Sequence, residues 1–400
     1  MRNSKERNTA ENLFSNLPDE ILGCIVSFLP NESALETSLI STRWRDLWNQ
    51  VLVRHGTTED ITGVVASFLA RFEELDPLKH PRKLQFHFGQ DTALFASIAT
   101  NSKLLLDFPF SHKDPEKQSY ELKFNLNMKN FTYQSFLPTF LVKTLYLKSV
   151  SFLTSGVASS IVSNLEHLEN LMIIECSGLQ SLFIESDSKL HKLTILDCLQ
   201  LKSLHLRTSK LKTFRYRGPL PRIWPESHFN LSHAMLDFTP GPSYSEFTAE
   251  DFNETLLTIK NSEDLTLCQW TFEALIWPSI STSSGNFIFY KLRELRWIGN
   301  HMDENSMNNL VSFLKLCPAL EQIFVTIDPE SFMVPRSNSG LMMQATKYTK
   351  LEHLKVIKFM GFKNRVDEIS VATKLIERVK GMRPKIETSN GSCLDVVFVQ

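Results

Sequence analysis

Polar and nucleophilic side chains in this sequence do not fall into the spacings that known catalytic sites require. The patterns G-x-x-x-x-G-K-[ST], G-x-G-x-x-G, G-x-S-x-G and H-E-x-x-H are all absent. They signal phosphate loops, dinucleotide-binding turns, hydrolase nucleophiles and zinc proteases, respectively. The 11 histidines are scattered, which is typical of surface or hydrogen-bonded polar residues. We therefore expect no catalytic residue, no metal site and no cofactor.

The cysteines could provide thiol chemistry, but their surroundings favour a structural role. None belongs to a C-x-x-C pair, and their neighbours are mostly Leu, Ile or Val. We expect free, buried thiols in a reducing compartment, not a disulfide framework or a zinc site. The six are Cys24, Cys176, Cys198, Cys268, Cys317 and Cys393. The Trp and Phe residues after position 260 have core spacing, so we expect them in the core and not in a ligand cage.

One stretch carries a strong local charge. Between Leu199 and Trp224 there is no Asp or Glu, whereas seven basic residues occur. Arginines can bind carboxylates and phosphates through two parallel hydrogen bonds, so the stretch could receive an acidic or phosphorylated segment. It could equally be a solvated rim. The seven residues are Lys202, Arg207, Lys210, Lys212, Arg215, Arg217 and Arg222.

Length and composition limit the kinds of protein that this chain can be. Its 400 residues exceed the size at which one core stops growing, which is roughly 250–300 residues, so we expect several domains or an array of repeats. The net charge of −1 argues against a binder of duplex nucleic acid. No apolar stretch approaches the roughly 20 residues that span a bilayer, and residues 1–12 lack the apolar run of a signal peptide. We expect a cytoplasmic or nuclear protein, or both, with neither nucleic acid nor membrane as a partner.

The elements begin with Leu13–Val51, which has the pattern of three short helices. Pro18 suits the first position of a helix, and Ser33 and Glu36 have capping-box spacing at the start of the second. About forty residues cannot bury so many large apolar side chains among themselves. The segment either packs on the rest of the chain or presents a docking surface to another protein.

This segment resembles the plant-type F-box. The matching residues are Leu17-Pro18-Asp19-Glu20-Ile21-Leu22, Ile25, Phe28-Leu29-Pro30, Ala34, Thr37-Ser38, Ile40-Ser41 and Arg43-Trp44-Arg45-Asp46-Leu47-Trp48. Thr42 and Glu36 depart from the basic residues that are common there, and Glu36 could weaken the choice of adaptor. The resemblance implies binding to a Skp-type adaptor and, through it, to a cullin–RING ubiquitin ligase. The adaptor-binding residues that it implies are Leu17, Pro18, Ile21, Leu22, Ile25, Leu29, Ile40 and Trp44.

A repeat follows in Leu168–Tyr216. The apolar positions Leu168, Leu171, Ile173, Cys176, Leu179, Leu182 and Ile184 recur 22 residues later as Leu190, Leu193, Ile195, Cys198, Leu201, Leu204 and Leu206. This is the strand signature of a leucine-rich repeat. Parallel strands should start near Leu145, Leu171, Leu193, Phe214, Leu265, Leu295, Ile323 and Leu354. Leu182 and Leu204 should lie on strand-like segments of an opposite wall, and Cys176 should stack on Cys198.

The repeat region resembles the leucine-rich repeats of plant F-box proteins, and Leu351–Lys380 resembles their FBD-type tail. The expected fold is α/β: a three-helix F-box followed by a leucine-rich-repeat solenoid with a parallel β-sheet. The expected divisions are a disordered leader (1–12), the F-box (13–51), a linker helix with irregular repeats (52–135), the solenoid (136–328) and an FBD-like repeat with a cap (329–400). Residues 90–135 and 218–260 have no legible pattern.

Strand alternation points to a surface on the sheet. The leucines of L-x-x-L-x-L face inward, so the residues between them face outward. We expect a substrate-binding face that changes from apolar to cationic, unless the chain's own linker or tail covers it. Its residues are Met172, Ile174, Thr194, Leu196, Arg215 and Arg217.

The expected function is that of a substrate receptor in an SCF-type (Skp–cullin–F-box) E3 ubiquitin ligase, which is not itself an enzyme. The F-box would dock the adaptor, and the repeats would bind a protein substrate whose identity the sequence does not give. A small molecule could complete the substrate surface. Two alternatives stay open: an F-box scaffold that acts outside a ligase, and an enzyme with a cryptic site in residues 218–300.

Overall fold

The computed structural model of the 400-residue chain divides into two compact units. One comprises Met1–Gln118 with Leu126–Lys148, and the other comprises Ser119–Asn125 with Ser149–Gln400. The structure describes residues 17–18, 21–22, 25, 43–44, 51–57, 60–70, 83–87, 93–99, 103–107, 142–150, 153–165, 167–184, 189–225, 231–244, 248–282, 287–301, 303–333, 349–360, 373, 375, 377, 379–380 and 385–389.

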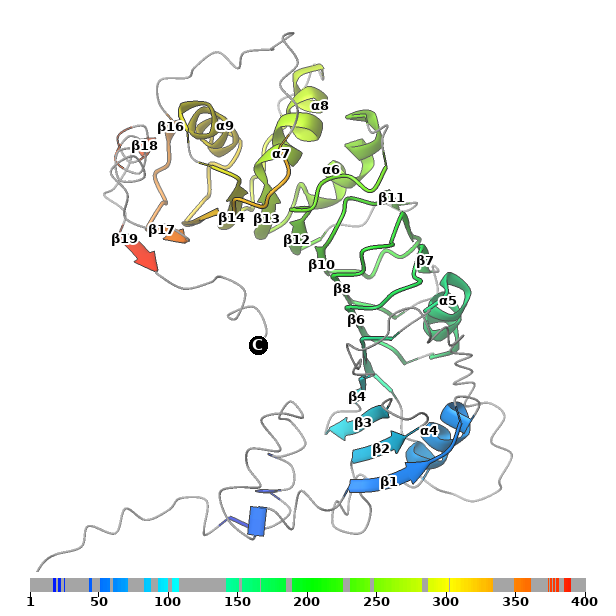
Figure 1. Cartoon of the computed structure of the whole chain (residues 1–400). Helices are drawn as coiled ribbons and strands as arrows, with labels where there is room; N and C mark the ends of the chain where they lie inside the picture. The colour runs from blue at the N-terminus through cyan, green and yellow to red at the C-terminus, as the bar shows by residue number, and fades with distance from the viewer. Residues whose placement is uncertain are drawn as a thin grey trace, which may run out of the picture. The chain divides into compact units, whose positions relative to one another are not determined.

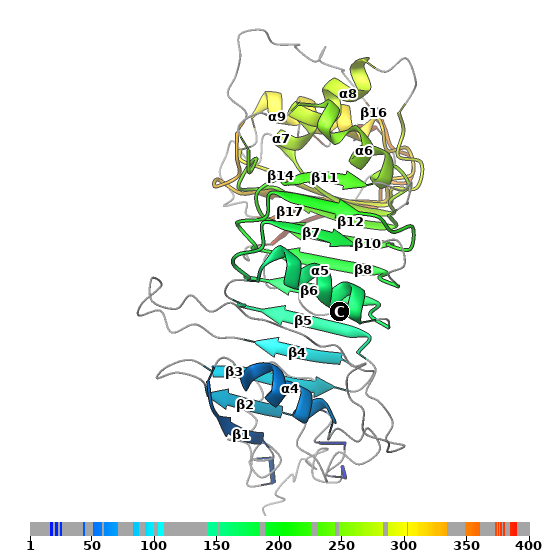
Figure 2. The same cartoon turned by 90° about the vertical axis from the view of Figure 1, so that its right-hand side faces the viewer.

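The first unit contains a mixed sheet with the strand order β1-β2-β3-β4-β5. The strands are β1 (Val51–His55), β2 (Lys83–His87), β3 (Ala93–Ala99), β4 (Lys103–Asp107) and β5 (Thr144–Lys148). Helix α4 (Ile61–Ala70) lies against β2 and buries Ile61, Val65 and Phe68 (Figure 2). This helix and β2 confirm the apolar patterns seen in the sequence.

Strands β2, β3 and β4 pair antiparallel, which differs from the uniformly parallel sheet expected of a solenoid. Their connections are short, and only antiparallel neighbours can be joined without a long crossover. The part of residues 90–135 that the structure describes therefore forms β3 and β4. Outside this hairpin arrangement, β1 pairs with β2 and β4 pairs with β5 in parallel.

The second unit contains a parallel sheet with the order β6-β8-β10-β12-β13-β14-β15-β17-β19. The strands are β6 (Asn170–Ile174), β8 (Lys192–Leu196), β10 (Thr213–Arg217), β12 (His233–Asp237), β13 (Asp264–Cys268), β14 (Glu294–Gly299), β15 (Gln322–Ile327), β17 (Val356–Met360) and β19 (Lys385–Ser389). Together with β5 of the first unit, they confirm the predicted strands; β17 begins two residues after the expected Leu354. Strand β12 falls in the region that had no legible pattern.

A second wall lies opposite the early strands of this sheet. Strands β7 (Ser181–Ile184), β9 (Ser203–Leu206) and β11 (Arg222–Pro225) form a three-stranded parallel sheet, which confirms the expected placement of Leu182 and Leu204. Helix α5 (Ser155–Asn164) contacts β7. A separate pair consists of β16 (Thr349–Lys350) and β18 (Val379–Lys380).

Farther along, helices replace this wall on the outer side of the curved sheet (Figure 1). They are η4 (Glu250–Phe252), α6 (Asn253–Ile259), α7 (Gln269–Thr271), the π-helix η5 (Phe272–Ile276), α8 (Trp277–Thr282) and α9 (Glu304–Leu314). Repeat length explains the change. From β6 to β12 the strands start about 20 residues apart, which leaves room for a short strand only, whereas from β12 to β15 they start about 30 residues apart.

The core lies between the sheet and its outer layer. In the short repeats it consists mainly of leucines, among them Leu171, Leu193 and Leu204, all at most 1% exposed. In the longer repeats aromatic rings fill the wider space, which confirms the expected core role of the late Trp and Phe residues. Trp270, Trp297, Phe272, Phe289, Phe313 and Phe359 are buried, and Phe272 contacts both Trp297 and Phe313 edge-on.

The two repeat cysteines occupy equivalent places after β6 and β8. The thiols of Cys176 and Cys198 are hydrogen-bonded to each other, so the predicted stacking is confirmed. This bond lowers the pKa of Cys176, and with burial it raises the pKa of Cys198 well above its ordinary range. Cys176, Cys198, Cys268 and Cys317 are free and buried, as expected. Cys24 and Cys393 lie outside the described residues.

Candidate protein-interaction surfaces

The N-terminal module divides its described apolar residues between the interior and the surface. The Pro18 carbonyl accepts bonds from the amides of Ile21 and Leu22 at 3.1 Å, which starts a helix. Leu22 is 0% exposed and Trp44 is 6% exposed, whereas Ile21 is 47% exposed. Pro18 is also exposed, and the side chains of Leu17 and Ile25 are half-buried.

This division separates two roles among the residues expected to bind an adaptor. Leu22 and Trp44 contribute to the module's own core, so their side chains support a docking surface from below. Leu17, Pro18, Ile21 and Ile25 retain exposed area that a partner can cover. The Arg43 guanidinium donates a hydrogen bond to the Leu17 carbonyl and so holds this first turn in place. Leu29 and Ile40 lie outside the described residues.

The second surface is the face of the parallel sheet that points away from the core. Strand register places the outward side chains of successive strands beside one another. We call the resulting line the central row; it consists of Met172, Thr194, Arg215, Met235, Thr266, Arg296, Phe324 and Lys358. Two residues farther along each strand is a second line, the distal row, which begins with Ile174, Leu196, Arg217 and Asp237.

All six residues predicted for the substrate surface belong to these two rows, but they are not equally accessible. Met172, Ile174, Arg215 and Arg217 are half-buried. Thr194 is 1% exposed and Leu196 is 3% exposed, so the expectation that their side chains are open to a partner is wrong. Thr194 is short and lies between the longer Met172 and Arg215 on the adjacent strands, where it is shielded.

The two predicted arginines also differ in their electrostatic partners. Arg217 forms an ion pair with Asp197, and its Nε lies 2.9 Å from the Asp197 Oδ1. This bond raises the pKa of Arg217, and the nearby carboxylates of Asp237 and Glu175 act in the same direction. The positive charge of Arg217 is therefore already neutralised within the chain.

Arg215 has no such partner. Among the described residues, no hydrogen bond or ion pair engages its guanidinium. Burial lowers its pKa, and the positive charge of Arg296 on the same row lowers it further. Arg296 is itself satisfied, because its Nε donates to the Glu294 Oε1 at 2.9 Å and its guanidinium stacks over Phe324 at 4.8 Å. Alternation in the sequence indicated the row, but only the register showed which cation is unpaired.

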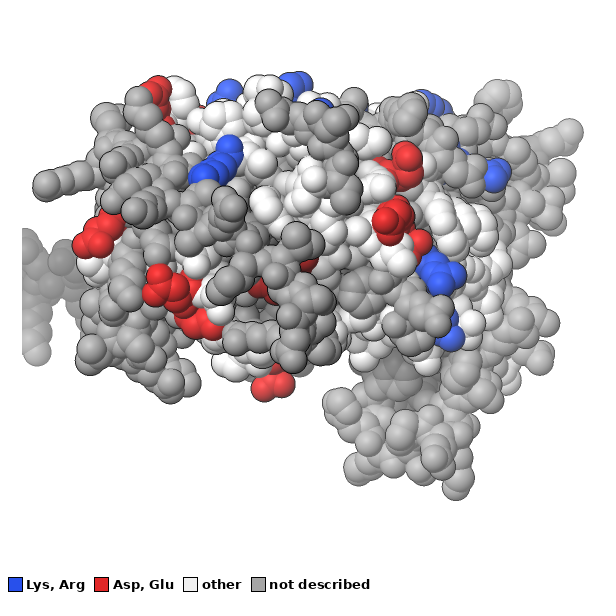
Figure 3. Space-filling model, turned by 90° about the horizontal axis from the view of Figure 1, so that it is seen from above, with Lys and Arg blue, Asp and Glu red and all other residues white. Residues whose placement is uncertain are grey.

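The other basic residues of the stretch 199–224 do not join this face. Arg222 lies on β11 of the second wall, where its guanidinium stacks over Tyr244 at 4.8 Å. Lys202, Arg207, Lys210 and Lys212 are exposed in the connections between the two walls. The stretch is therefore not one patch. Figure 3 shows acidic and basic side chains together on the described surface seen from above.

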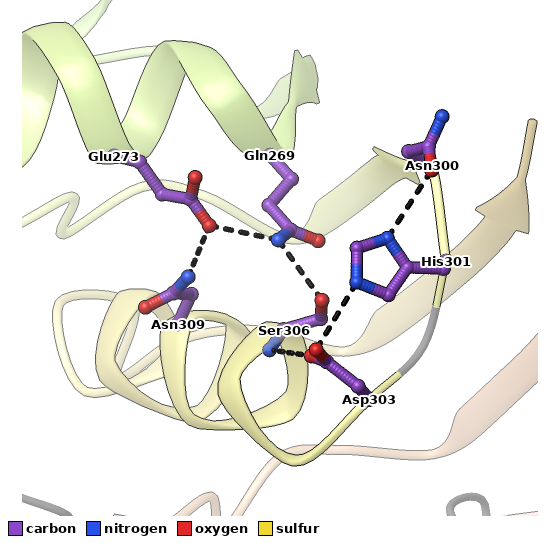
Figure 4. A network of polar contacts seen from close by, with 7 residues as sticks. All are labelled: Gln269, Glu273, Asn300, His301, Asp303, Ser306 and Asn309. Atoms are coloured by element: carbon purple, nitrogen blue, oxygen red, sulfur yellow. Dashed lines mark hydrogen bonds and ion pairs between the residues drawn. The ribbon is translucent and has the colours of Figure 1, made fainter. Parts of the chain in front are cut away.

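A buried polar network joins the outer layer of two neighbouring repeats (Figure 4). Gln269 Nε2 donates to the Glu273 Oε1 at 2.7 Å and to the Ser306 Oγ at 3.0 Å, and Asn309 donates to the same Glu273 oxygen. At its edge, His301 Nε2 lies 3.1 Å from the Asp303 Oδ2. Asp303 caps α9 by accepting from the Ser306 amide at 2.8 Å.

The central carboxyl of this network has a perturbed pKa. Burial raises the pKa of Glu273, and the bonds from Gln269 and Asn309 oppose that shift only in part. Sequence analysis did not identify the network, because its two halves are more than thirty residues apart. Its groups satisfy one another and hold α7, η5 and α9 together, which is a structural role.

Two further searches of the described residues found nothing. No group of three or more His, Cys, Asp and Glu side chains there has an arrangement that could hold a metal ion. Within the same part of the chain, no helix is both long enough and apolar enough to cross a membrane.

Parallel strands stacked in register, with leucine-rich cores and an outer layer that changes with repeat length, define a leucine-rich-repeat domain. Comparison with known families agrees. Residues 100–382 match the At1g61320/AtMIF1 leucine-rich-repeat domain, and residues 14–55 match the F-box domain. The chain belongs to the plant F-box/leucine-rich-repeat family.

Relatives from Arabidopsis thaliana have the same organisation in their names. The chain is 23% identical to the putative FBD-associated F-box protein At1g61330 over 415 residues, which covers 95% of this chain and 92% of that protein. It is 41% identical to the F-box/FBD/LRR-repeat protein At5g22660 over 90 residues, covering 21% of this chain and 19% of the relative. The putative F-box protein At1g67390 is 49% identical over 41 residues, 10% of this chain and 9% of its own length.

Proposed function

We propose that this protein is the substrate-recognition subunit of an SCF-type E3 ubiquitin ligase. F-box/leucine-rich-repeat proteins are in general non-catalytic receptors of such ligases. Here the F-box would dock a Skp-type adaptor, and the outward sheet face would bind a protein substrate. The observation that carries the proposal is the match of residues 14–55 to the F-box domain.

The receptor's contribution to ubiquitin transfer would be proximity. Holding two reactants in a fixed geometry converts a bimolecular step into an effectively unimolecular one, and this requires no catalytic residue in the receptor. The exposed Ile21 beside the buried Leu22 suits this role, because an interface anchor must be accessible while its support is rigid.

The test of adaptor docking is a Leu17→Ala, Pro18→Ala double variant of the full chain. Central interface anchors contribute about 2 kcal/mol or more, so adaptor affinity should fall roughly 30-fold. The measurement is co-purification with a Skp-type adaptor. Leu199→Ala, which removes a 66% exposed leucine from the repeats, is the matched control and should leave adaptor binding unchanged. Undiminished co-purification of the double variant would contradict the proposal.

The same purification separates the ligase receptor from an F-box scaffold. A receptor should bring down both adaptor and cullin, whereas a scaffold outside the ligase should bring down the adaptor alone. Proteasome and ligase inhibition during the experiment would retain bound substrates.

We further propose that the protein acts in the cytoplasm, the nucleus or both. Free, buried thiols at Cys176, Cys198, Cys268 and Cys317 support a reducing compartment. A fluorescent fusion of the full chain would test this location.

A further inference from the structure

The central row contains one cation whose charge nothing in the described chain offsets. Three arginines lie close together on this face, and two are matched: Arg217 by Asp197, and Arg296 by Glu294. Arg215 lies half-buried, without a carboxylate, and close enough to Arg296 for the two positive charges to repel. A partly buried charge without a partner is costly, so a folded chain that retains one favours an anion from outside.

A second, independent feature lies directly beside it. The hydroxyl oxygen of Thr194 is buried and has no hydrogen-bond partner. Register aligns Thr194 with Arg215 on the adjacent strand, at the roughly 4.8 Å spacing of neighbouring strands. Leaving a buried hydroxyl unsatisfied costs free energy that a bound acceptor would restore. Two unsatisfied donors thus face the same small area of the sheet.

Apolar side chains flank these donors along the row. Met172 precedes Thr194, and Met235 follows Arg215, both half-buried. Methionine is flexible and polarisable, so it adapts to apolar side chains of different shapes. The row therefore alternates an apolar site, a donor pair and another apolar site across four adjacent strands.

We propose that Arg215 and Thr194 together bind one carboxylate side chain of the substrate protein, with Met172 and Met235 receiving apolar side chains on either side of it. One guanidinium and one hydroxyl match the two oxygens of a single carboxylate. A phosphate carries nearly two charges at neutral pH and would leave one of them unmatched here, because Arg217 and Arg296 are already paired. The inference rests on the proposed receptor function and assigns its substrate class.

The test uses the full chain bound to its adaptor to select from a displayed library of random twelve-residue peptides. The wild type should enrich Asp or Glu flanked by Met, Leu, Ile or Phe. A hydrogen bond to a charged group contributes about 1.5–3 kcal/mol, so Arg215→Glu should weaken the selected peptides roughly 10- to 150-fold. Selection on Arg215→Glu should instead enrich Lys or Arg, a reversal that misfolding cannot produce. Lys212→Glu, an equal charge change at an exposed site, should keep the acidic preference.

Thr194→Val distinguishes a binding role from a structural one. It replaces the unsatisfied hydroxyl with a methyl group of similar shape, so the melting temperature should rise or stay unchanged while affinity for the selected peptide falls. If wild type enriches no acidic residue, or if Thr194→Val lowers stability and leaves affinity unchanged, the site is not the one described.

A synthetic pair of peptides decides the anion. The selected peptide should bind at least as tightly with Glu as with phosphoserine in its place; a tenfold preference for phosphoserine would overturn the carboxylate assignment. Adaptor co-purification by Arg215→Glu is measured in parallel. Its loss would bear on the receptor function as a whole, whereas loss of the acidic consensus with adaptor retained would bear on this site alone.

Discussion

At the scale of single residues, partner choice decides which charges are available. Arg215 and Arg217 are two positions apart on β10 and point to the same face. Asp197 holds Arg217, and nothing in the described chain holds Arg215. The residue type predicted both as anion ligands, but the arrangement of neighbours leaves only one with that capacity.

Glu273 offers a residue-scale test of the polar network. Its folded-state pKa is raised by burial, so the native state holds this proton more tightly than the unfolded chain, where the pKa is about 4.3. The stabilising contribution is complete below the unfolded pKa and is lost as pH rises through the folded pKa. Glu273→Gln removes this dependence, so the variant should gain stability relative to wild type between pH 4.5 and pH 7.5.

Urea unfolding of both proteins at those two pH values measures the change. Glu330→Gln, at an exposed site, is the control and should leave the difference between the pH values as it is in wild type. A Glu273→Gln variant whose stability follows wild type at both pH values would show that burial does not perturb this carboxyl.

At the scale of elements, each strand depends on one or two inward leucines that contact the rungs on both sides. Leu193 on β8 is 0% exposed and register-matched to Leu171 and Phe214. Truncating a buried leucine removes apolar contacts and leaves a cavity, which costs about 2–5 kcal/mol. Leu193→Ala should therefore lower the free energy of unfolding by that amount.

Leu199 is the matched control for this truncation, because it is the same residue type six positions on and 66% exposed. Leu199→Ala should change stability by less than about 0.5 kcal/mol. Chemical denaturation of the two variants and wild type compares them directly. Equal effects at both positions would mean that β8 does not bury its alternate side chains as described.

At the scale of the whole molecule, the two interaction surfaces belong to different elements and share no residue. Substitutions at sites without shared partners have nearly additive effects. A protein that combines Leu17→Ala and Pro18→Ala with Arg215→Glu should lose adaptor to the extent of the first pair alone, and selected peptide to the extent of the last alone. Binding measurements on all three proteins form the cycle. A coupling above about 0.5 kcal/mol would show that the surfaces communicate.

Sequence by itself determined the repeat and its direction. The recurrence of Leu171 and Ile173 as Leu193 and Ile195 predicted parallel strands in register, since side-chain alternation allows only one register that buries every leucine. Ordered motif residues from Leu17 to Trp48 identified the F-box, and the scattered cysteines predicted free thiols, which four of them are.

Tertiary structure alone decided what each predicted surface residue can do. Burial of Thr194 and Leu196, pairing of Arg217, and convergence of Glu273 with Asn309 all depend on side chains that lie many residues away in the chain. Strand β12 and the antiparallel β3 escaped pattern reading because short or mixed sequences support several pairings equally well. Periodicity reports which face a residue is on, but exposure and charge depend on neighbours that folding brings together.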